Sequence, residues 1–257
     1  MRGVLILTEG RSGSNWLGSL TNPTGTLGKS SEWVDKSISG INPRKVSCDE
    51  FVERILKLAS TENGFFSIKL FPRHIHQFQI YYGKDLIKYI CDSQEVLLLR
   101  LTRLDRLGQA ISFCKALQTG EWKATTGRKN TPIYDFNQIC RCYFMIGRSY
   151  DFWSNYTNIT QLKVVNFIYE DLLEDPTAWV DEIANFAGIT YSKKILRPDT
   201  QIQRNAQSEV WRDQFLREIS SSEFLAQTTP SEFPRRTITN LVRFVFGRQM
   251  KPVPYST

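Results

Sequence analysis

The sequence has 257 residues, of which 41% are apolar and 23% are charged, as is usual for a globular domain that buries its own core. No apolar run reaches the length of about 18 residues that a membrane span requires, which excludes a spanning helix. The five cysteines form no CxxC pair and no Cys/His cluster, so we expect reduced thiols in a soluble, cytoplasmic protein. The net charge of +7 and pI of about 9.2 indicate a polyanionic partner, either nucleic acid or a nucleotide.

The N-terminal half predicts buried strands that run into polar turns. Continuously apolar runs bounded by Gly and Ser are typical of parallel strands, whose two faces are both covered. In chain order we predict a strand at Gly3–Thr8, a turn at Glu9–Ser14, a helix starting over Asn15–Leu20, mostly loop over Thr21–Arg44, a capping box at Ser47 and Glu50 with a helix through Ala59, and a strand at Phe65–Leu70.

The C-terminal half continues the alternation of strands and helices. Glycines mark two helix ends, at Gly120 and Gly188. We predict, in order, a strand at Glu95–Leu99, a helix at Asp105–Thr119, a loop at Glu121–Tyr134, an aromatic helix at Asp135–Tyr156, a strand at Leu162–Phe167, a helix at Pro176–Ala187, and helical patches at Ser208–Ile219 and Ser231–Phe246.

This order of elements predicts an α/β fold with a parallel central sheet flanked by helices. We expect one domain over residues 1–257, with a mobile loop at 121–134 and a helical C-terminal part from about residue 207. In such sheets ligands bind beyond the carboxyl ends of the strands, so the residues that follow each strand are the first candidates for a site.

Two such places carry charge that suits an anion. After the first strand, Arg11–Asn15 joins a Gly/Ser turn to a helix start, where backbone N–H groups can hold a phosphate. The turn lacks the Lys of a kinase-type P-loop, and it could equally be a tight strand–helix connection. After the third strand, Arg100, Arg103 and Arg106 are crowded together, either around an anion or on a surface paired with carboxylates. Two separate phosphate sites would suit a nucleotide with phosphates on both sides of its ribose.

With these features the sequence resembles the sulfotransferases that use 3′-phosphoadenosine 5′-phosphosulfate (PAPS), and within them the bacterial trehalose 2-sulfotransferase-like group. The longest likeness is a run of a dozen positions that agree in order. The segments that carry the resemblance are Arg11–Ser14, Gly28–Trp33, Leu101–Ser112 with Gln118–Trp122, and Tyr169–Pro176 with Gln203–Asn205 and Trp211.

The resemblance implies a P-loop-like sulfotransferase architecture and a sulfuryl transfer to a hydroxyl of a small acceptor, a sugar or a hydroxylated secondary metabolite, without a required metal. It implies that Glu32 is the general base. Lys69 ends the second strand, where it could stabilise the leaving phosphate or be a surface lysine with its head group in water. The residues expected at the cofactor are Arg11, Ser12, Gly13, Ser14, Asn15, Trp16, Arg103, Arg106, Ser112 and Arg204. Two departures from the group stand out: Leu104 replaces a frequent second Arg, and Ser30 replaces a frequent Pro.

Several alternatives remain open at this level. His76 could replace Glu32 as the base, and a second His at position 74 creates an HxH pattern that lacks a third metal ligand. The aromatic helix could pack internally or form a homodimer face. The rival functions are a P-loop-type nucleotide phosphotransferase and a basic RNA-binding protein without catalysis. We expect neither nucleic acid nor membrane as a partner.

Overall fold

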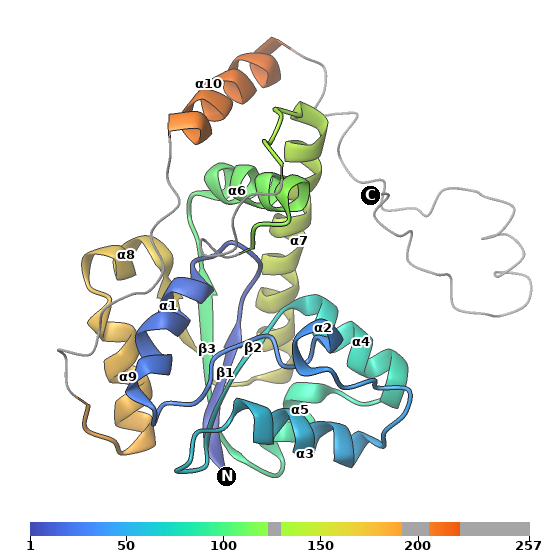
Figure 1. The fold of residues 1–257 in the computed structure, drawn as a ribbon, viewed down its shortest axis with the longest axis vertical. Coiled ribbons are helices and arrows are strands. Elements are labelled where there is room, and N and C mark those ends of the chain that lie inside the picture. Colours follow the sequence, from blue (N-terminus) through green and yellow to red (C-terminus); the bar gives the residue numbers. More distant parts are fainter. Residues whose placement is uncertain (123–129, 192–205, 222–257) are drawn as a thin grey trace, which may run out of the picture. The chain divides into compact units, whose positions relative to one another are not determined.

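In the computed structural model of the chain, four parallel strands of the described residues form one sheet in the order β2-β1-β3-β4. The structure describes residues 1–122, 130–191 and 206–221 (Figure 1). The strands are β1 (Arg2–Leu7), β2 (Phe65–Leu70), β3 (Glu95–Thr102) and β4 (Val165–Ile168). Leu5 of β1 pairs with Ile68 on one side and Leu98 on the other, which places β1 at the centre. The predicted parallel α/β fold is confirmed.

Helices cover both faces of the sheet because alternate residues of each strand point to opposite sides. Leu5 and Leu7 pack in the core shared with α3, α4, α5 and α7, and Val4 and Ile6 pack in the core shared with α1, α8 and α9 (Figure 1). The helices are α1 (Ser14–Thr21), the 3₁₀ turn η1 (Asn22–Thr24), α2 (Lys36–Ser39), α3 (Cys48–Ala59), α4 (Pro72–Tyr82), α5 (Leu86–Cys91), α6 (Arg106–Thr119), α7 (Phe136–Thr160), α8 (Tyr169–Glu174), α9 (Thr177–Ala187) and α10 (Ala206–Ser221).

Local sequence explains where several helices begin and end. Ser47 accepts a hydrogen bond from the Glu50 N–H at the start of α3, and Asp105 accepts one from the Gly108 N–H at the start of α6. Gly120 ends α6 in the left-handed conformation, which costs little without a Cβ. These helix boundaries agree with the sequence predictions.

The sequence predictions missed α2, α4, α5 and α8, and they misplaced two strand ends. The helix α4 carries a signal that could have revealed it, because Pro72 occupies its first turn, Gly83 follows its last residue, and Ile75 and Phe78 face the core. The strand β3 continues to Thr102 rather than Leu99, since its end pairs with β4. In turn β4 lies at Val165–Ile168, later than predicted.

The chain consists of two compact units, the first from Met1 to Leu216 and the second from Arg217 to Thr257. The sheet and the helices through α9 lie in the first unit, and α10 crosses the boundary. The predicted helix at Ser231–Phe246, most of the predicted loop (Lys123–Lys129) and Arg204 fall outside the described residues. Among the described residues, no helix combines the length and apolarity needed to cross a membrane.

Candidate active site

The turn after β1 is built like an anion cradle. Thr8 fixes it, because its hydroxyl lies 3.1 Å from the Leu101 carbonyl oxygen and 2.8 Å from the Ser12 hydroxyl, and both hydroxyls are buried. Gly13 has a φ of 95° and caps α1 without a side chain, so no capping group covers the first-turn N–H groups. A Cβ on Gly13 would overlap the Tyr169 ring. Free N–H groups and the helix dipole together favour a bound anion.

Arg11 connects this turn to the loop and helix that follow β3. It adopts a φ of 63°, uncommon for a residue with a Cβ. Its Nε donates to the Ser112 hydroxyl over 2.9 Å, and its Nη1 donates to the Trp122 carbonyl over 2.8 Å. Arg103 donates from Nη1 to the Arg11 carbonyl over 3.1 Å. Burial, with the charge of Arg103, lowers the pKa of Arg11. The structure thus brings together Arg11, Arg103 and Ser112, which are distant in sequence.

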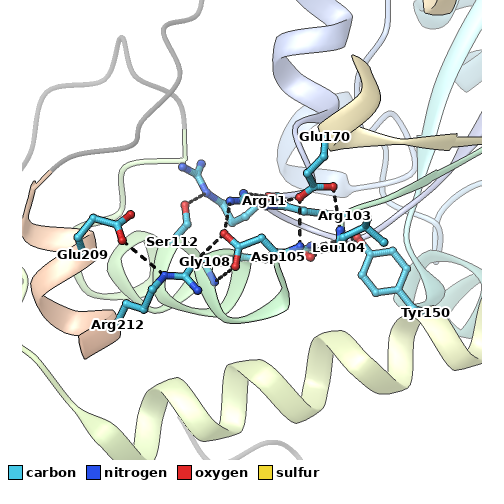
Figure 2. Close-up of polar contacts among 11 residues, drawn as sticks. Arg11, Arg103, Leu104, Asp105, Gly108, Ser112, Tyr150, Glu170, Glu209 and Arg212 are labelled. Atoms are coloured by element: carbon cyan, nitrogen blue, oxygen red, sulfur yellow. Dashed lines mark hydrogen bonds and ion pairs between the residues drawn. The ribbon is translucent and has the colours of Figure 1, made fainter. Parts of the chain in front are cut away.

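Among the described residues, Arg103 has no close carboxylate partner. Its side chain is buried, yet the distances from its nitrogens to Asp105 and Glu170 are 3.5 and 3.9 Å, and its Nε has no hydrogen-bond partner in the same part of the chain (Figure 2). Its guanidinium also lies 5.1 Å from the Tyr169 ring centre. Since a buried cation with only long ion pairs is costly, this geometry favours a bound anion.

A second charged cluster surrounds Glu32. The Lys69 N–H donates to the Ser31 carbonyl over 2.9 Å, which ties the Glu32 segment to β2. The buried Lys69 ammonium donates to the Asn15 side-chain oxygen and lies 3.9 Å from one Glu32 oxygen. Arg73, at the start of α4, donates to the other Glu32 oxygen over 3.2 Å. Lys69 therefore links the proposed base to Asn15, which follows the anion cradle.

Gly28 allows this segment to lie against β2. Its φ is 79°, and a Cβ there would lie 2.5 Å from the backbone nitrogen of Ser67, which cannot move without breaking the strand. The Gly in the Gly28–Trp33 segment is thus explained by a close backbone approach.

Glu32, Asp35 and His74 each offer one ligand atom within 4.8 Å of the others, which raises the question of a metal. The Nδ1 atom of His74 accepts the Phe71 N–H over 3.2 Å, so the neutral ring carries its proton on Nε2 and offers no lone pair there. Burial lowers the pKa of His74 to about 3, with help from Arg73 and Lys69. Because Arg73 already pairs with both carboxylates, the residues fit a hydrogen-bonded charge cluster better than a metal site.

Some predicted site residues lie elsewhere. His76 is exposed on α4 and contacts the edge of Phe152, whereas His74, on the other side of the helix, faces Glu32. The Arg106 guanidinium lies 3.5 Å from the Tyr150 ring centre, on the α7 side of α6. Trp16 packs edge-on against Tyr169. The structure therefore brings neither His76 to Glu32 nor Arg106 to Ser112.

Sequence reasoning also missed residues that the structure adds to the site. Arg73 and Asp35 join the Glu32 cluster, and Glu170 and Arg212 join the Arg103 cluster (Figure 2). Glu170 stood in the Tyr169–Pro176 segment, and Asp105 stood at a recognisable N-cap, so both had local signals. Arg212 had none, because its partner lies 107 residues away.

A parallel sheet with an anion cradle beyond its central strand defines a P-loop-like α/β protein. The family model described as Stf0 sulphotransferase matches residues 3–218. The chain belongs to this family of sulfotransferases, which confirms the resemblance seen in the sequence. A comparison with curated proteins gave no significant match.

Three solved structures are similar to the chain at low identity. The sulfotransferase domain of the Synechococcus PCC 7002 olefin synthase is 15% identical, covering 91% of this chain and 96% of that one, with a TM-score of 0.39. The sulfotransferase domain of the curacin biosynthetic pathway is 13% identical, with 98% and 99% covered and a TM-score of 0.41. Retinol dehydratase in complex with retinol and PAP is 13% identical, with 90% and 82% covered and a TM-score of 0.40.

Proposed function

We propose that this sulfotransferase takes its sulfuryl group from PAPS and transfers it to a hydroxyl of a small acceptor, a sugar or a hydroxylated secondary metabolite. The observation that carries the proposal is the pair of adjacent arginines, Arg11 and Arg103, beside Ser112 and the anion cradle. A donor with phosphates on both sides of one ribose would engage the cradle and the arginines together.

The cradle suits the 5′-phosphosulfate. The backbone of Ser12, Gly13 and Ser14 would hold the phosphosulfate oxygens, with the Asn15 side chain and the Arg11 guanidinium beside them. Lys69, which donates to Asn15, would stabilise the charge that develops on the bridging oxygen as the leaving phosphate departs. These groups supply the positive field that in-line transfer requires.

Arg103 and Ser112 suit the 3′-phosphate. Arg103 can offer a bidentate pair of N–H donors, and Ser112 can offer its hydroxyl, which now lies 2.9 Å from Arg11. We propose a smaller role for Arg106 in binding the 3′-phosphate, because its guanidinium lies over the Tyr150 ring. The proposed role of Arg204 rests on the resemblance alone.

Glu32 would be the general base. It would take the hydroxyl proton of the acceptor as the acceptor oxygen attacks sulfur and the bond from sulfur to the bridging oxygen breaks. A quarter of its side chain is exposed, so an acceptor can reach it, and Lys69 joins it to the cradle. Its neighbour Arg73 is more exposed and borders the space that the acceptor would enter.

Thermal unfolding in the presence of nucleotides tests the donor. Adenosine 3′,5′-bisphosphate (PAP) should raise the melting temperature, because a ligand at 100 times its Kd stabilises a protein by about 2.7 kcal/mol. ATP with Mg²⁺ should raise it much less. The reverse order would favour a phosphotransferase and contradict the proposal, and transfer of labelled sulfate from PAPS to a panel of alcohols then identifies the acceptor.

A further inference from the structure

Arg212 on α10 makes a close ion pair with Asp105. One guanidinium nitrogen, Nη2, lies 2.6 and 2.7 Å from the two oxygens of the Asp105 carboxylate (Figure 2). Burial alone would raise the pKa of Asp105, but hydrogen bonds from Arg212 and Gly108 outweigh it, and the pKa is lowered. Asp105 in turn raises the pKa of Arg212. The carboxylate is therefore ionised and engaged by Arg212.

Asp105 is also the carboxylate nearest to Arg103. The closest distance between the two is 3.5 Å, against 2.6 Å for Arg212. Because ion-pair strength depends on distance and on hydrogen-bond geometry, Arg212 takes the larger share of the Asp105 charge. The two arginines thus compete for one carboxylate, and Arg212 has the better position.

The other carboxylate near Arg103 is engaged as well. Glu170 accepts the N–H groups of Leu104 and Asp105 over 2.9 and 3.1 Å, one on each oxygen, and its distance to Arg103 is 3.9 Å. Beyond the hydrogen bond from its Nη1 to the Arg11 carbonyl, Arg103 has two long ion pairs and a buried Nε that makes no hydrogen bond among the described residues. Its remaining donors can therefore turn to another anion.

We propose that Arg212 is a positioning residue for the 3′-phosphate of the donor: it holds Asp105 away from Arg103, so that Arg103 can bind the phosphate. Without Arg212, Asp105 would turn to Arg103, occupy its donors and repel the incoming phosphate. The inference rests on the proposed function, since it assumes that Arg103 binds a 3′-phosphate.

Calorimetric titration with PAP and with AMP, which lacks the 3′-phosphate, tests the inference. Arg212→Gln should weaken the binding of PAP on the order of tenfold, the size expected for the loss of one charge-assisted hydrogen bond. The affinity for AMP should stay within about twofold. Adding Asp105→Asn to this variant should restore the affinity for PAP to within about threefold of that of the unmodified protein. Asn can still cap α6, but it carries no negative charge that could pair with Arg103. Arg217→Gln, which removes the same charge from an exposed position of the same helix, should leave the ratio of PAP to AMP affinity unchanged.

The outcomes separate the alternatives. If Arg212 only anchors α10, the double variant will bind PAP no better than Arg212→Gln, and the positioning role is overturned. Equal losses of affinity for PAP and AMP in Arg212→Gln overturn the positioning role too. If the unmodified protein itself shows no preference for PAP over AMP, then the proposed donor is wrong rather than the role of Arg212. Circular dichroism of each variant verifies that the fold is kept.

Discussion

Two charged clusters, one around Glu32 and one around Arg103, flank the turn after β1, and they differ in how their carboxylates are engaged. In the Glu32 cluster, Arg73 donates directly to Glu32 over 3.2 Å, and the ion pairs of Lys69 with Glu32 and of Arg73 with Asp35 are 3.9 and 3.5 Å long. In the Arg103 cluster, the ion pairs of Arg103 are equally long, but Asp105 and Glu170 accept shorter hydrogen bonds from Arg212 and from backbone N–H groups.

The difference indicates what each cluster does. A cluster whose charges are internally matched is stable without a ligand and can accept a proton on one carboxylate. A cluster in which a buried arginine has only long ion pairs can take up an anion. We therefore propose proton transfer for the Glu32 cluster and phosphate binding for the Arg103 cluster, and variants should separate the two functions.

The largest effect is expected for Glu32→Gln. Loss of the general base should lower kcat on the order of 10²–10⁴-fold, while PAP affinity should change little because Glu32 contacts the acceptor side. Steady-state kinetics with PAPS and calorimetry with PAP measure the two quantities. Asp35→Asn, a neighbouring carboxylate that shares Arg73, is the matched control and should reduce kcat by much less. Undiminished turnover in Glu32→Gln removes Glu32 as the base.

Arg103→Ala should produce the opposite pattern. Loss of the charge-assisted contacts to the 3′-phosphate should weaken PAP binding about 10–100-fold and AMP binding much less. Arg106→Ala makes a useful comparison, because that side chain lies against Tyr150 and should matter more for stability than for PAP. Similar PAP affinities in both variants would show that the two arginines were assigned wrongly.

Substitutions at two glycines test whether the segment that carries Glu32 packs closely against β2. Gly25 and Gly28 have φ angles of 67° and 79°, but only Gly28 has backbone within reach of a new Cβ. Gly25→Ala should cost about 1 kcal/mol of unfolding free energy, and Gly28→Ala about 1–3 kcal/mol more because of overpacking. Urea denaturation measures both. Equal costs would mean that the segment does not press against β2.

A further effect concerns the pH dependence of stability. His74 is buried and neutral, with its pKa lowered from 6.5 to about 3, so the unfolded chain binds a proton first as the pH falls. Its contribution to stability is complete above pH 6.5 and declines below it, by at most about 1.4 kcal/mol per pH unit. His74→Asn, which can still accept the Phe71 N–H, should flatten the stability profile between pH 6.5 and 4.5. An unchanged slope would contradict the burial of a neutral ring.

The sequence predicted the fold well where one signal acted alone. Largely apolar segments followed by polar residues predicted β1, β2 and β3, whereas β4 was placed too early, and capping residues marked the main helices. Of the helices that it missed, α4 carried end signals in Pro72 and Gly83, whereas α2, α5 and α8 have only 4, 6 and 6 residues, too few for a helical period to stand out. The end of β3 likewise depended on β4, which pairs with it only in the folded protein.

Site residues could be predicted from the sequence where they lie at the carboxyl ends of strands. Arg11, Lys69 and Arg103 each lie at or beyond a carboxyl strand end, and Glu32 was identified by resemblance. Their partners were harder to predict. Glu170 lies in a recognised segment, but its approach to Arg103 joins residues far apart in sequence, and Arg212 reaches Asp105 across 107 residues. Helical phase decided that His74 rather than His76 faces Glu32.

A crystal structure of the protein with bound PAP tests the division between the two clusters most directly. We predict that the 3′-phosphate lies within hydrogen-bond distance, about 2.7–3.2 Å, of Arg103 and Ser112, with Arg212 still on Asp105, and that the 5′-phosphate lies on the turn beside Lys69. A 3′-phosphate that contacts neither Arg103 nor Ser112, or a nucleotide bound away from the turn, would contradict the account.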